Sequence, residues 1–371
     1  MNFDKNNYLP GSHPDLPPPA GTVGILGWLR NNLFSSLSNT VLTLVSVFFL
    51  YLFIDSAINW FVLDAVVDAN DKPGCRKLGD GACWAVITRR FDQFIYGFYP
   101  TAERWRLDTS FFLLFFAAAP LLYPDIKFRK TLLVFSLIYP FLAFILIKGG
   151  FFGLESIETN QFGGTMLTVV IGVTSIACSL PLGILLALGR QSRLKLIKYI
   201  SICFIEFMRG VPLITLLFVA STMLNYFLPP GSNFNLLVRV MIMMTFFSAA
   251  YIAEVIRGGI QAIPKGQYEA ADAIGLTYWQ TTRFITLPQA LKISIPGIVN
   301  TFIGLYKDTT LVVIIGLLDP LGIGRAALAD TKWNGLSTET YLFVAVIFFI
   351  SCFAMSRYSL WLEKKLSTEH K

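Results

Sequence analysis

Charged side chains that interrupt apolar runs are the residues of this chain best suited to chemistry. Lys307 and Asp308 stand inside the apolar run 293–318, and the hydroxyl residues Thr309 and Thr310 follow them. A charged group is costly in hydrocarbon, so it usually faces a cavity or a partner. We therefore expect these four residues either to line a solute path or to form a structural charge pair that sets helix packing or a subunit contact.

A second charged pair flanks a break in another apolar run. Glu206 and Arg209 are three residues apart, which places them on one face of a helix. Gly210 and Pro212 follow, in the order typical of one helix ending and the next beginning. The pair is expected either to form a gate or pivot at the inner end of the path or to reach toward the membrane interface as a snorkelling pair.

Two further charge sites lie at the ends of the run 236–256. Glu254 and Arg257 are also three residues apart, and we predict an ion pair beside a hinge rather than a substrate site. Arg239 begins the run and is expected to anchor it at the interface.

The sequence argues against several kinds of catalytic site. The two histidines, His13 and His370, lie near the chain ends. This position disfavours a histidine-dependent metal site, a Ser-His-Asp triad and an intramembrane histidine relay. No G-x-x-x-x-G-K-S/T loop occurs, so we do not expect ATP binding by that route. We predict no catalytic residue, no metal site and no cofactor on this chain.

The composition indicates an all-α integral membrane protein. Apolar residues make up 54% of the 371 residues and charged residues 14%, against roughly 25% charged in soluble domains. The mean hydropathy is +0.61. Several runs reach the ~20 residues that a spanning helix needs. The net charge of +7 is then expected to reflect cytoplasmic loops and not a nucleic-acid surface.

Eight apolar runs predict about eight spans with both termini on one side. The basic turns 127–130 and 190–198 and the basic tail fall on that side, which the positive-inside rule identifies as the cytoplasm. The intervening segment 64–107 is expected outside and folded, since it is rich in aromatic residues. The predicted spans are 39–60, 109–123, 131–147, 165–188, 196–227 with its break, 236–256, 293–318 and 340–361.

Two of the five cysteines lie in the predicted external segment. Cys75 and Cys83 are eight residues apart. If the cell is a Gram-negative bacterium, the external compartment is oxidising, which favours a disulfide between them over two free thiols.

A polar stretch between two apolar runs is too well patterned for a simple loop. Residues 269–274 predict a short helix, and Gly275 suits the left-handed position after it. Thr277 and Gln280 have the spacing of a capping box that starts a second helix. Pro288 predicts a further helix boundary, because the residue before a proline disfavours helical backbone.

The same stretch resembles the cytoplasmic coupling loop of ABC importer permeases, which reads E-A-A-x3-G-x9-I-x-L-P. In that family the loop forms a short helix that sits in a cleft of the ATP-hydrolysing subunit. The alternative is an ordinary loop with two amphipathic turns. The resemblance implies that coupling to the ATPase involves Glu269, Ala270, Ala271, Gly275, Ile285, Leu287 and Pro288, with Asp272 in the same short helix.

Other segments are similar to permeases for polar amino acids. IEFMRGVPLI at 205–214 and the stretches 253–271 and 287–312 carry this likeness. Segments 30–44 and 81–100 resemble the larger permease subunit of the general L-amino-acid importer. The chain departs from the usual permease of about five spans, because three further spans precede that core.

The resemblance implies a division of the chain into segments. The working core would be an ABC type-1 permease domain formed by the last five spans. The implied segments are a flexible cytoplasmic arm 1–37, a three-span extension 38–160, a permease domain 161–362 with its coupling loop at 258–290, and a cytoplasmic tail 363–371.

The resemblance also implies a multi-subunit importer in the bacterial inner membrane. A second permease subunit would complete a heterodimer surrounded by membrane lipid, and two ATPase copies would carry ATP and Mg. A periplasmic binding protein would deliver L-amino acids for alternating-access transport. The main alternative is an ion-coupled secondary transporter, which should show paired broken helices in two repeats. A membrane enzyme is a third reading, disfavoured by the missing catalytic residues.

Overall fold

The computed structural model describes residues 24–123, 125–223, 226, 229 and 234–367. The chain forms two compact units. The first comprises the chain up to Val67 together with Cys75–Cys83, and the second comprises Asp68–Gly74 and Trp84–Lys371. His13 and His370 lie outside the described residues.

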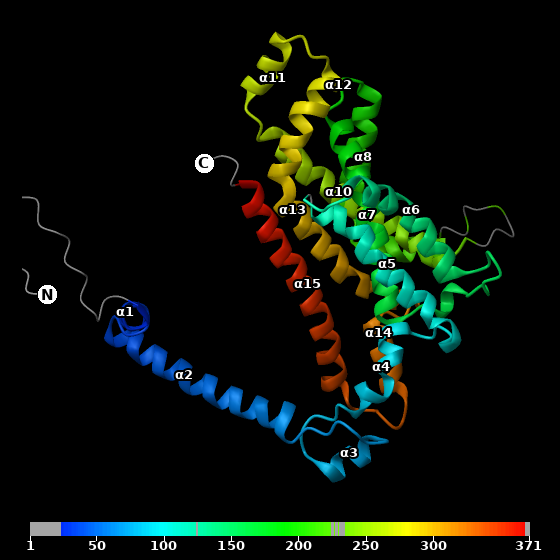
Figure 1. Ribbon diagram of the computed structural model, residues 1–371. Coiled ribbons are helices and arrows are strands. Elements are labelled where there is room, and N and C mark those ends of the chain that lie inside the picture. Colours follow the sequence, from blue (N-terminus) through cyan, green and yellow to red (C-terminus); the bar gives the residue numbers. More distant parts are fainter. Residues whose placement is uncertain (1–23, 124, 224–225, 227–228, 230–233, 368–371) are drawn as a thin grey trace, which may run out of the picture. The chain divides into compact units, whose positions relative to one another are not determined.

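The predicted all-α membrane architecture is confirmed (Figure 1). Seven helical segments of the described chain are long and apolar enough to cross a membrane, or eight if one bent pair counts as a span. The seven are Leu37–Leu63, Thr101–Leu122, Arg129–Lys148, Gly164–Arg190, Leu236–Gln261, Tyr278–Ile315 and Ser337–Lys365, and the bent pair is Lys195–Gly210 with Leu213–Met223.

The first unit is built on one long helix. Helix α2 (Leu37–Ile58) follows the short α1 (Gly24–Asn32), so the C-terminal part of the predicted arm 1–37 is helical. The Ser36 hydroxyl caps α2 by accepting a hydrogen bond from the Asn39 amide. Within this unit no residue of α2 is buried, although the helix is apolar throughout.

The core of the second unit is a helix bundle. Helices α7 (Gly164–Arg190), α10 (Leu236–Gln261) and α13 (Leu287–Asp308) pack against one another. They approach closely where glycine faces a bulky partner, and a Cβ on Gly183 would lie only 2.6 Å from the Ile252 side chain. Around them lie α5 (Arg104–Leu122), α6 (Arg129–Lys148), α8 (Lys195–Gly210), α9 (Leu213–Phe218), α14 (Pro320–Ala329) and α15 (Ser337–Ser367).

The aromatic segment before α5 is folded, as its composition predicts. Helix α4 (Ala85–Tyr96) packs on α7 and α14. Phe94 is fully buried, with its ring 5.1 Å from that of Phe343. The Tyr99 hydroxyl donates to the Ile147 carbonyl at 2.8 Å, and burial raises the pKa of Tyr99 to about 12.

The predicted break after Glu206 and Arg209 is confirmed and is sharp. Helix α8 ends at Gly210, and Pro212 caps the start of α9 with extended backbone. The two helices meet at 103°. At the far end of the bent segment, Arg239 donates hydrogen bonds to backbone carbonyls.

Arg239 does not anchor its helix at the interface, so that prediction is wrong. Its side chain is buried and donates to the carbonyls of Ala220 and Ser221 at 3.0 and 2.8 Å. These carbonyls belong to the π-helical turn Val219–Met223 that ends the bent segment. The arginine therefore satisfies helix-end acceptors that have no helical partner.

The boundary predicted at Pro288 is found, since α13 begins at Leu287, but the non-helical backbone expected before the proline is not. Leu287 keeps helical backbone at φ −64° and ψ −42°, and helical structure runs from Tyr278 to Ile315. A π-helical turn, Thr282–Thr286, ends two residues before the proline, and the Leu287 amide bonds back to the Thr282 carbonyl. This wider turn accommodates the proline within the helix.

Candidate coupling loop and charge sites

The predicted short helix is α11 (Lys265–Ala273), and it ends as predicted. Gly275 has φ +75°, in the left-handed region. Its amide bonds to the Asp272 carbonyl at 3.0 Å, and the Leu276 amide bonds to the Ala271 carbonyl at 3.1 Å. This pair of bonds is the Schellman motif, which satisfies the last carbonyls of the helix. The turn geometry thus depends on glycine at position 275.

The second predicted helix, α12 (Tyr278–Thr281), begins with the expected capping box. The Thr277 hydroxyl accepts from the Gln280 amide at 3.4 Å, and the Gln280 side chain accepts from the Thr277 amide at 2.9 Å. Figure 1 shows α11 and α12 together at one end of the second unit. The structure therefore forms a helix-turn-helix at the matched stretch.

Some residues of the matched pattern are buried and others are exposed. Ala271 is fully buried, whereas Glu269, Ala270 and Asp272 are exposed. Further along, Ile285 and Leu287 are half-buried and Pro288 is exposed. Three apolar side chains near the turn are also exposed. Their exposed fractions are 73% for Ile274, 50% for Tyr278 and 70% for Trp279.

Charged residues from three helices meet near this end of the unit. We call Arg190, Glu206, Arg209, Glu254 and Arg257 the Glu254 cluster. Arg190 and Arg257 each contact the Glu254 carboxylate at 2.8 Å, and Arg209 approaches it to 3.6 Å. The Glu254 side chain is only 13% exposed, so its arginine contacts offset the cost of removing a carboxylate from water. The ion pair predicted between Glu254 and Arg257 is confirmed.

Glu206 and Arg209 bind different partners within the described residues. Glu206 pairs with Arg190 at 2.8 Å, while Arg209 contacts Glu254 and lies over the Tyr251 ring at 5.6 Å. The two residues thus connect α8 to the ends of α7 and α10. Their arrangement is a bridge between helices and not the isolated snorkelling pair that their spacing suggests.

The four residues around Lys307 lie where α13 tightens into the 3₁₀-helix Thr309–Ile315. The Lys307 side chain is exposed, and Asp308 is half-buried. Thr309 is buried, and its hydroxyl donates to the Tyr306 carbonyl at 2.7 Å. Thr310 donates likewise to the Lys307 carbonyl at 2.9 Å. Among described residues no ion pair joins Lys307 to Asp308.

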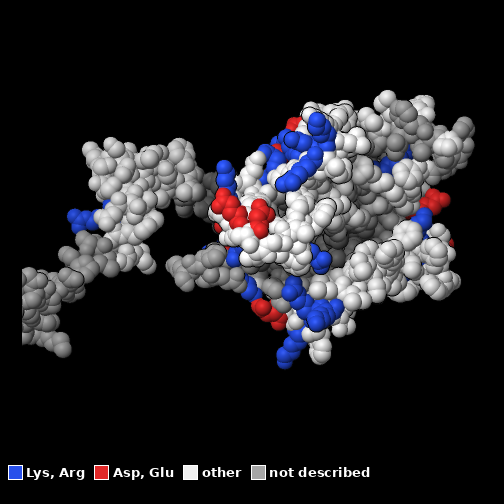
Figure 2. All heavy atoms as spheres, turned by 90° about the horizontal axis from the view of Figure 1, so that it is seen from above, with Lys and Arg blue, Asp and Glu red and all other residues white. Residues whose placement is uncertain are grey.

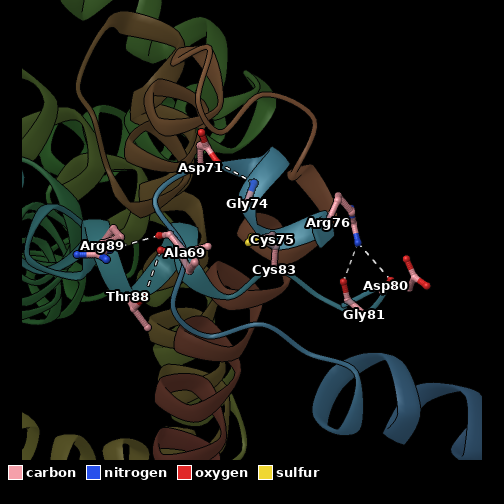
Figure 3. Close-up of a disulfide and its surroundings, with 11 residues drawn as sticks. Ala69, Asp71, Gly74, Cys75, Arg76, Asp80, Gly81, Cys83, Thr88 and Arg89 are labelled. Atoms are coloured by element: carbon pink, nitrogen blue, oxygen red, sulfur yellow. Dashed lines mark hydrogen bonds between the residues drawn. A yellow bond between two sulfur atoms is a disulfide. The ribbon is translucent and has the colours of Figure 1, made fainter. Parts of the chain in front are cut away.

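Cys75 and Cys83 form a disulfide in the first unit (Figure 3). Both cysteines are buried. The Arg76 side chain donates to the carbonyls of Asp80 and Gly81 at 3.2 and 2.8 Å and so closes the same loop. Formation of the bond in the cell remains a prediction.

Arg106 and Asp319 are among the buried charged residues that the sequence reasoning missed. Arg106 is 2% exposed and pairs with Glu103 at 2.6 Å. Asp319 is fully buried and caps α14 by accepting from the Gly322 amide at 2.9 Å. Burial raises the pKa of Asp319 to about 6. The Asp-Pro order at 319–320 was an available signal, because a capping residue followed by proline often starts a helix.

Comparisons with known proteins identify the family of this chain. The family described as "Binding-protein-dependent transport system inner membrane component" matches residues 179–368. The chain is 46% identical to the glutamate/glutamine/aspartate/asparagine transport system permease protein BztC of Rhodobacter capsulatus, over 96% of both chains. It is also 46% identical to the inner membrane amino-acid ABC transporter permease protein YhdY of Escherichia coli, over 96% of this chain and 97% of that one.

A solved structure, titled as a crystal structure of an amino acid ABC transporter with histidines, is 30% identical in sequence and has a TM-score of 0.49. The match covers 54% of this chain and 91% of that one.

The family has defined consequences for this chain. It is an inner-membrane, multi-pass transport component and not an enzyme, and ATP hydrolysis takes place on a separate ATPase subunit. An ATPase and a binding protein are the partners that the family implies. The chain belongs to the inner-membrane permeases of binding-protein-dependent transport systems, in the branch of the amino-acid ABC importers.

Proposed function

We propose that this chain is one permease subunit of a heterodimer that imports L-amino acids, with two ATPase copies docked at its cytoplasmic end and a periplasmic binding protein outside. The relative from Rhodobacter is named for glutamate, glutamine, aspartate and asparagine, so these four are the first substrates to test. ATP and Mg would bind the ATPase only.

The observation that carries the proposal is the helix-turn-helix at 265–281. It presents Glu269, Asp272 and Trp279 outward on a turn fixed by Gly275. A small helix with acidic and aromatic side chains and a rigid end is suited to a cleft in another protein, because little conformational entropy is lost on docking.

The Glu254 cluster supplies a route from the docked loop to the spans. Helix α10 leads directly into the coupling loop, and Glu254 connects it to α7 and α8. When ATP binding closes the ATPases, movement of α11 would be transmitted to these three helices as a group. The spans would then change from inward-facing to outward-facing.

Lys307 and Asp308 are the candidates for the transport path. Lys307 is exposed near the C-terminal end of α13, within the segment Tyr278–Ile315 that could span the membrane, and has no ion pair among the described residues. Such a charge needs a polar neighbour in the membrane. A water-filled path shared with the second permease subunit would provide one, and Thr309 and Thr310 extend the polar element.

The proposed orientation places both chain termini in the cytoplasm. This requires the bent pair α8 and α9 to count as one crossing. The coupling loop then lies on the cytoplasmic side together with the basic turn at 190–198. Reporter fusions after residues 35 and 367 should both be active only for a cytoplasmic reporter.

The proposal is tested by purifying the tagged chain from mild detergent and identifying its companions. An ATPase subunit in stoichiometric amount is expected, and Glu269→Arg or Gly275→Trp should release it. Glu363→Arg is the matched control, because Glu363 is exposed but lies outside the coupling loop. A chain that purifies alone and takes up solute with an ion gradient would instead support a secondary transporter.

A further inference from the structure

A pocket opens behind the coupling helix, and the proposed function does not use it. Its volume is about 530 Å³. Arg190 at the end of α7, Lys198 and Ile202 of α8, Arg257 of α10 and Tyr268 of α11 line it. The pocket thus joins the ends of three spanning helices to the coupling helix.

The pocket is positively charged. Three of its lining residues are cations, and no lining residue is a carboxylate. Glu254 holds Arg190 and Arg257 in place at 2.8 Å, whereas Lys198 has no ion pair among the described residues. The Glu254 cluster holds three arginines and two carboxylates, and Lys198 adds a fourth cation at the pocket. Figure 2, viewed from this end, shows Lys and Arg gathered on the surface.

The same pocket has an apolar side. Ile202 and Ile260 contribute to its lining. Tyr199 is three residues from Ile202, hence on the same side of α8, and its ring is 65% exposed. An apolar face at the end of a spanning segment lies against acyl chains or at their boundary with the headgroups. The pocket is therefore open to a molecule with an anionic head and an apolar body.

We propose that this pocket binds the phosphate headgroup of an anionic phospholipid. Basic pockets between spanning helices recognise such headgroups, and guanidinium groups donate hydrogen bonds well to phosphate oxygens. Lys198 supplies the cation without a competing carboxylate, and the acyl chains lie along α8. Because Tyr268 belongs to α11, the bound headgroup contacts the coupling helix itself.

Native mass spectrometry of the purified transporter tests the proposal. The probes are phosphatidylglycerol and, as the zwitterionic comparison, phosphatidylcholine. Lys198→Gln is expected to lower phosphatidylglycerol binding about fivefold, as for one lysine near an anionic surface, and Lys198→Glu to lower it further. Lys195→Gln is the matched control, since Lys195 is exposed on the same helix but does not line the pocket. It should leave binding unchanged.

Three results would overturn the proposal. The first is equal loss of lipid in the Lys198 and Lys195 variants, and the second is equal binding of the two lipids. The third is displacement of the lipid by millimolar inorganic phosphate, which would assign the pocket to free phosphate. None of these readouts depends on transport or on the ATPase, so they are separable from failure of the proposed function.

Discussion

At the scale of single residues, backbone conformation distinguishes two glycines of the coupling loop. Gly266 and Gly275 both have open space where a Cβ would stand. Only Gly275 has a positive φ, at +75°. The functional turn therefore depends on glycine for its backbone and not for its small size.

Gly275→Ala should destabilise the turn by about 1–2 kcal/mol, the cost of left-handed backbone for a residue with a Cβ. Gly266→Ala should stabilise α11 by up to ~1 kcal/mol, because alanine is the better helix former. Hydrogen exchange of the 265–281 amides measures both effects. Equal protection in the two variants would contradict the role given to the turn.

A second residue-scale prediction concerns pH and the buried Asp319. Its pKa is raised to about 6 in the folded protein, so the folded state binds the proton more tightly than the unfolded state does. Stability is therefore greatest below the unfolded pKa of ~4 and falls as pH rises through ~4 to 6.

Asp319→Asn should remove this contribution, because asparagine keeps the capping acceptor for Gly322 but does not ionise. Thermal unfolding of the detergent-solubilised protein at pH 4, 5, 6 and 7 is the measurement. If the melting temperature of the variant changed with pH as steeply as that of the wild type, other groups would be the cause of the pH dependence.

At the scale of elements, the sequence predicted the helices better than the contacts between them. The apolar runs and the spacing of Thr277 and Gln280 are local patterns, and the structure follows them. The partners of Glu206 and Arg239 lie on other helices, so spacing along one helix could not identify them. The backbone before Pro288 was misread for a related reason, since the π-helical turn before it compensates for the proline.

Glu254→Gln tests the connection between α7, α8 and α10. The change leaves partly buried arginines without their carboxylate, so we expect a loss on the order of 3 kcal/mol. Glu206→Gln is the matched control, because its side chain is 54% exposed and exposed pairs contribute at most about 1 kcal/mol. Glu254→Gln should lower both the thermal stability and the ratio of transport to ATP hydrolysis. Glu206→Gln should lower neither.

The crossing of α10 and α13 gives a further prediction at this scale. A Cβ on Gly259 would lie 2.6 Å from the Ala290 carbonyl oxygen, whereas one on Gly258 would meet no heavy atom within 4 Å. Gly259→Ala should therefore cost about 1–3 kcal/mol as the helices are forced apart. Gly258→Ala should leave the melting temperature unchanged or raise it. Similar losses of stability in both variants would mean that helix propensity, and not packing at the crossing, causes the effect.

At the scale of the whole molecule, the matched loop pattern indicated the family, and the apolar runs predicted about eight crossings, of which the described part of the structure has seven or, with the bent pair, eight. Seven residues at fixed spacing form a specific pattern, and the role that this pattern implies follows from the sequence alone. Gly210 and Pro212 predicted the break between α8 and α9, but no local pattern predicted its angle of 103°. The second permease subunit likewise lies beyond what one chain specifies.

The disulfide tests the placement of the external segment. Cys75 and Cys83 enclose a short loop, and the bond should contribute about 2–3 kcal/mol through loop closure. Non-reduced protein from the membrane should resist labelling at these two positions, while Cys178, Cys203 and Cys352 are free. Labelling of all five cysteines without reductant would contradict an oxidising location.

Helix α2 has a consequence for how the protein is made. It is the first span in chain order among the described residues, and within its own unit none of its residues is buried. A span that needs no later neighbour can leave the translocon for the bilayer as soon as it is synthesised. The growing chain would then be tethered to the membrane before the ribosome reaches the more polar helices of the bundle.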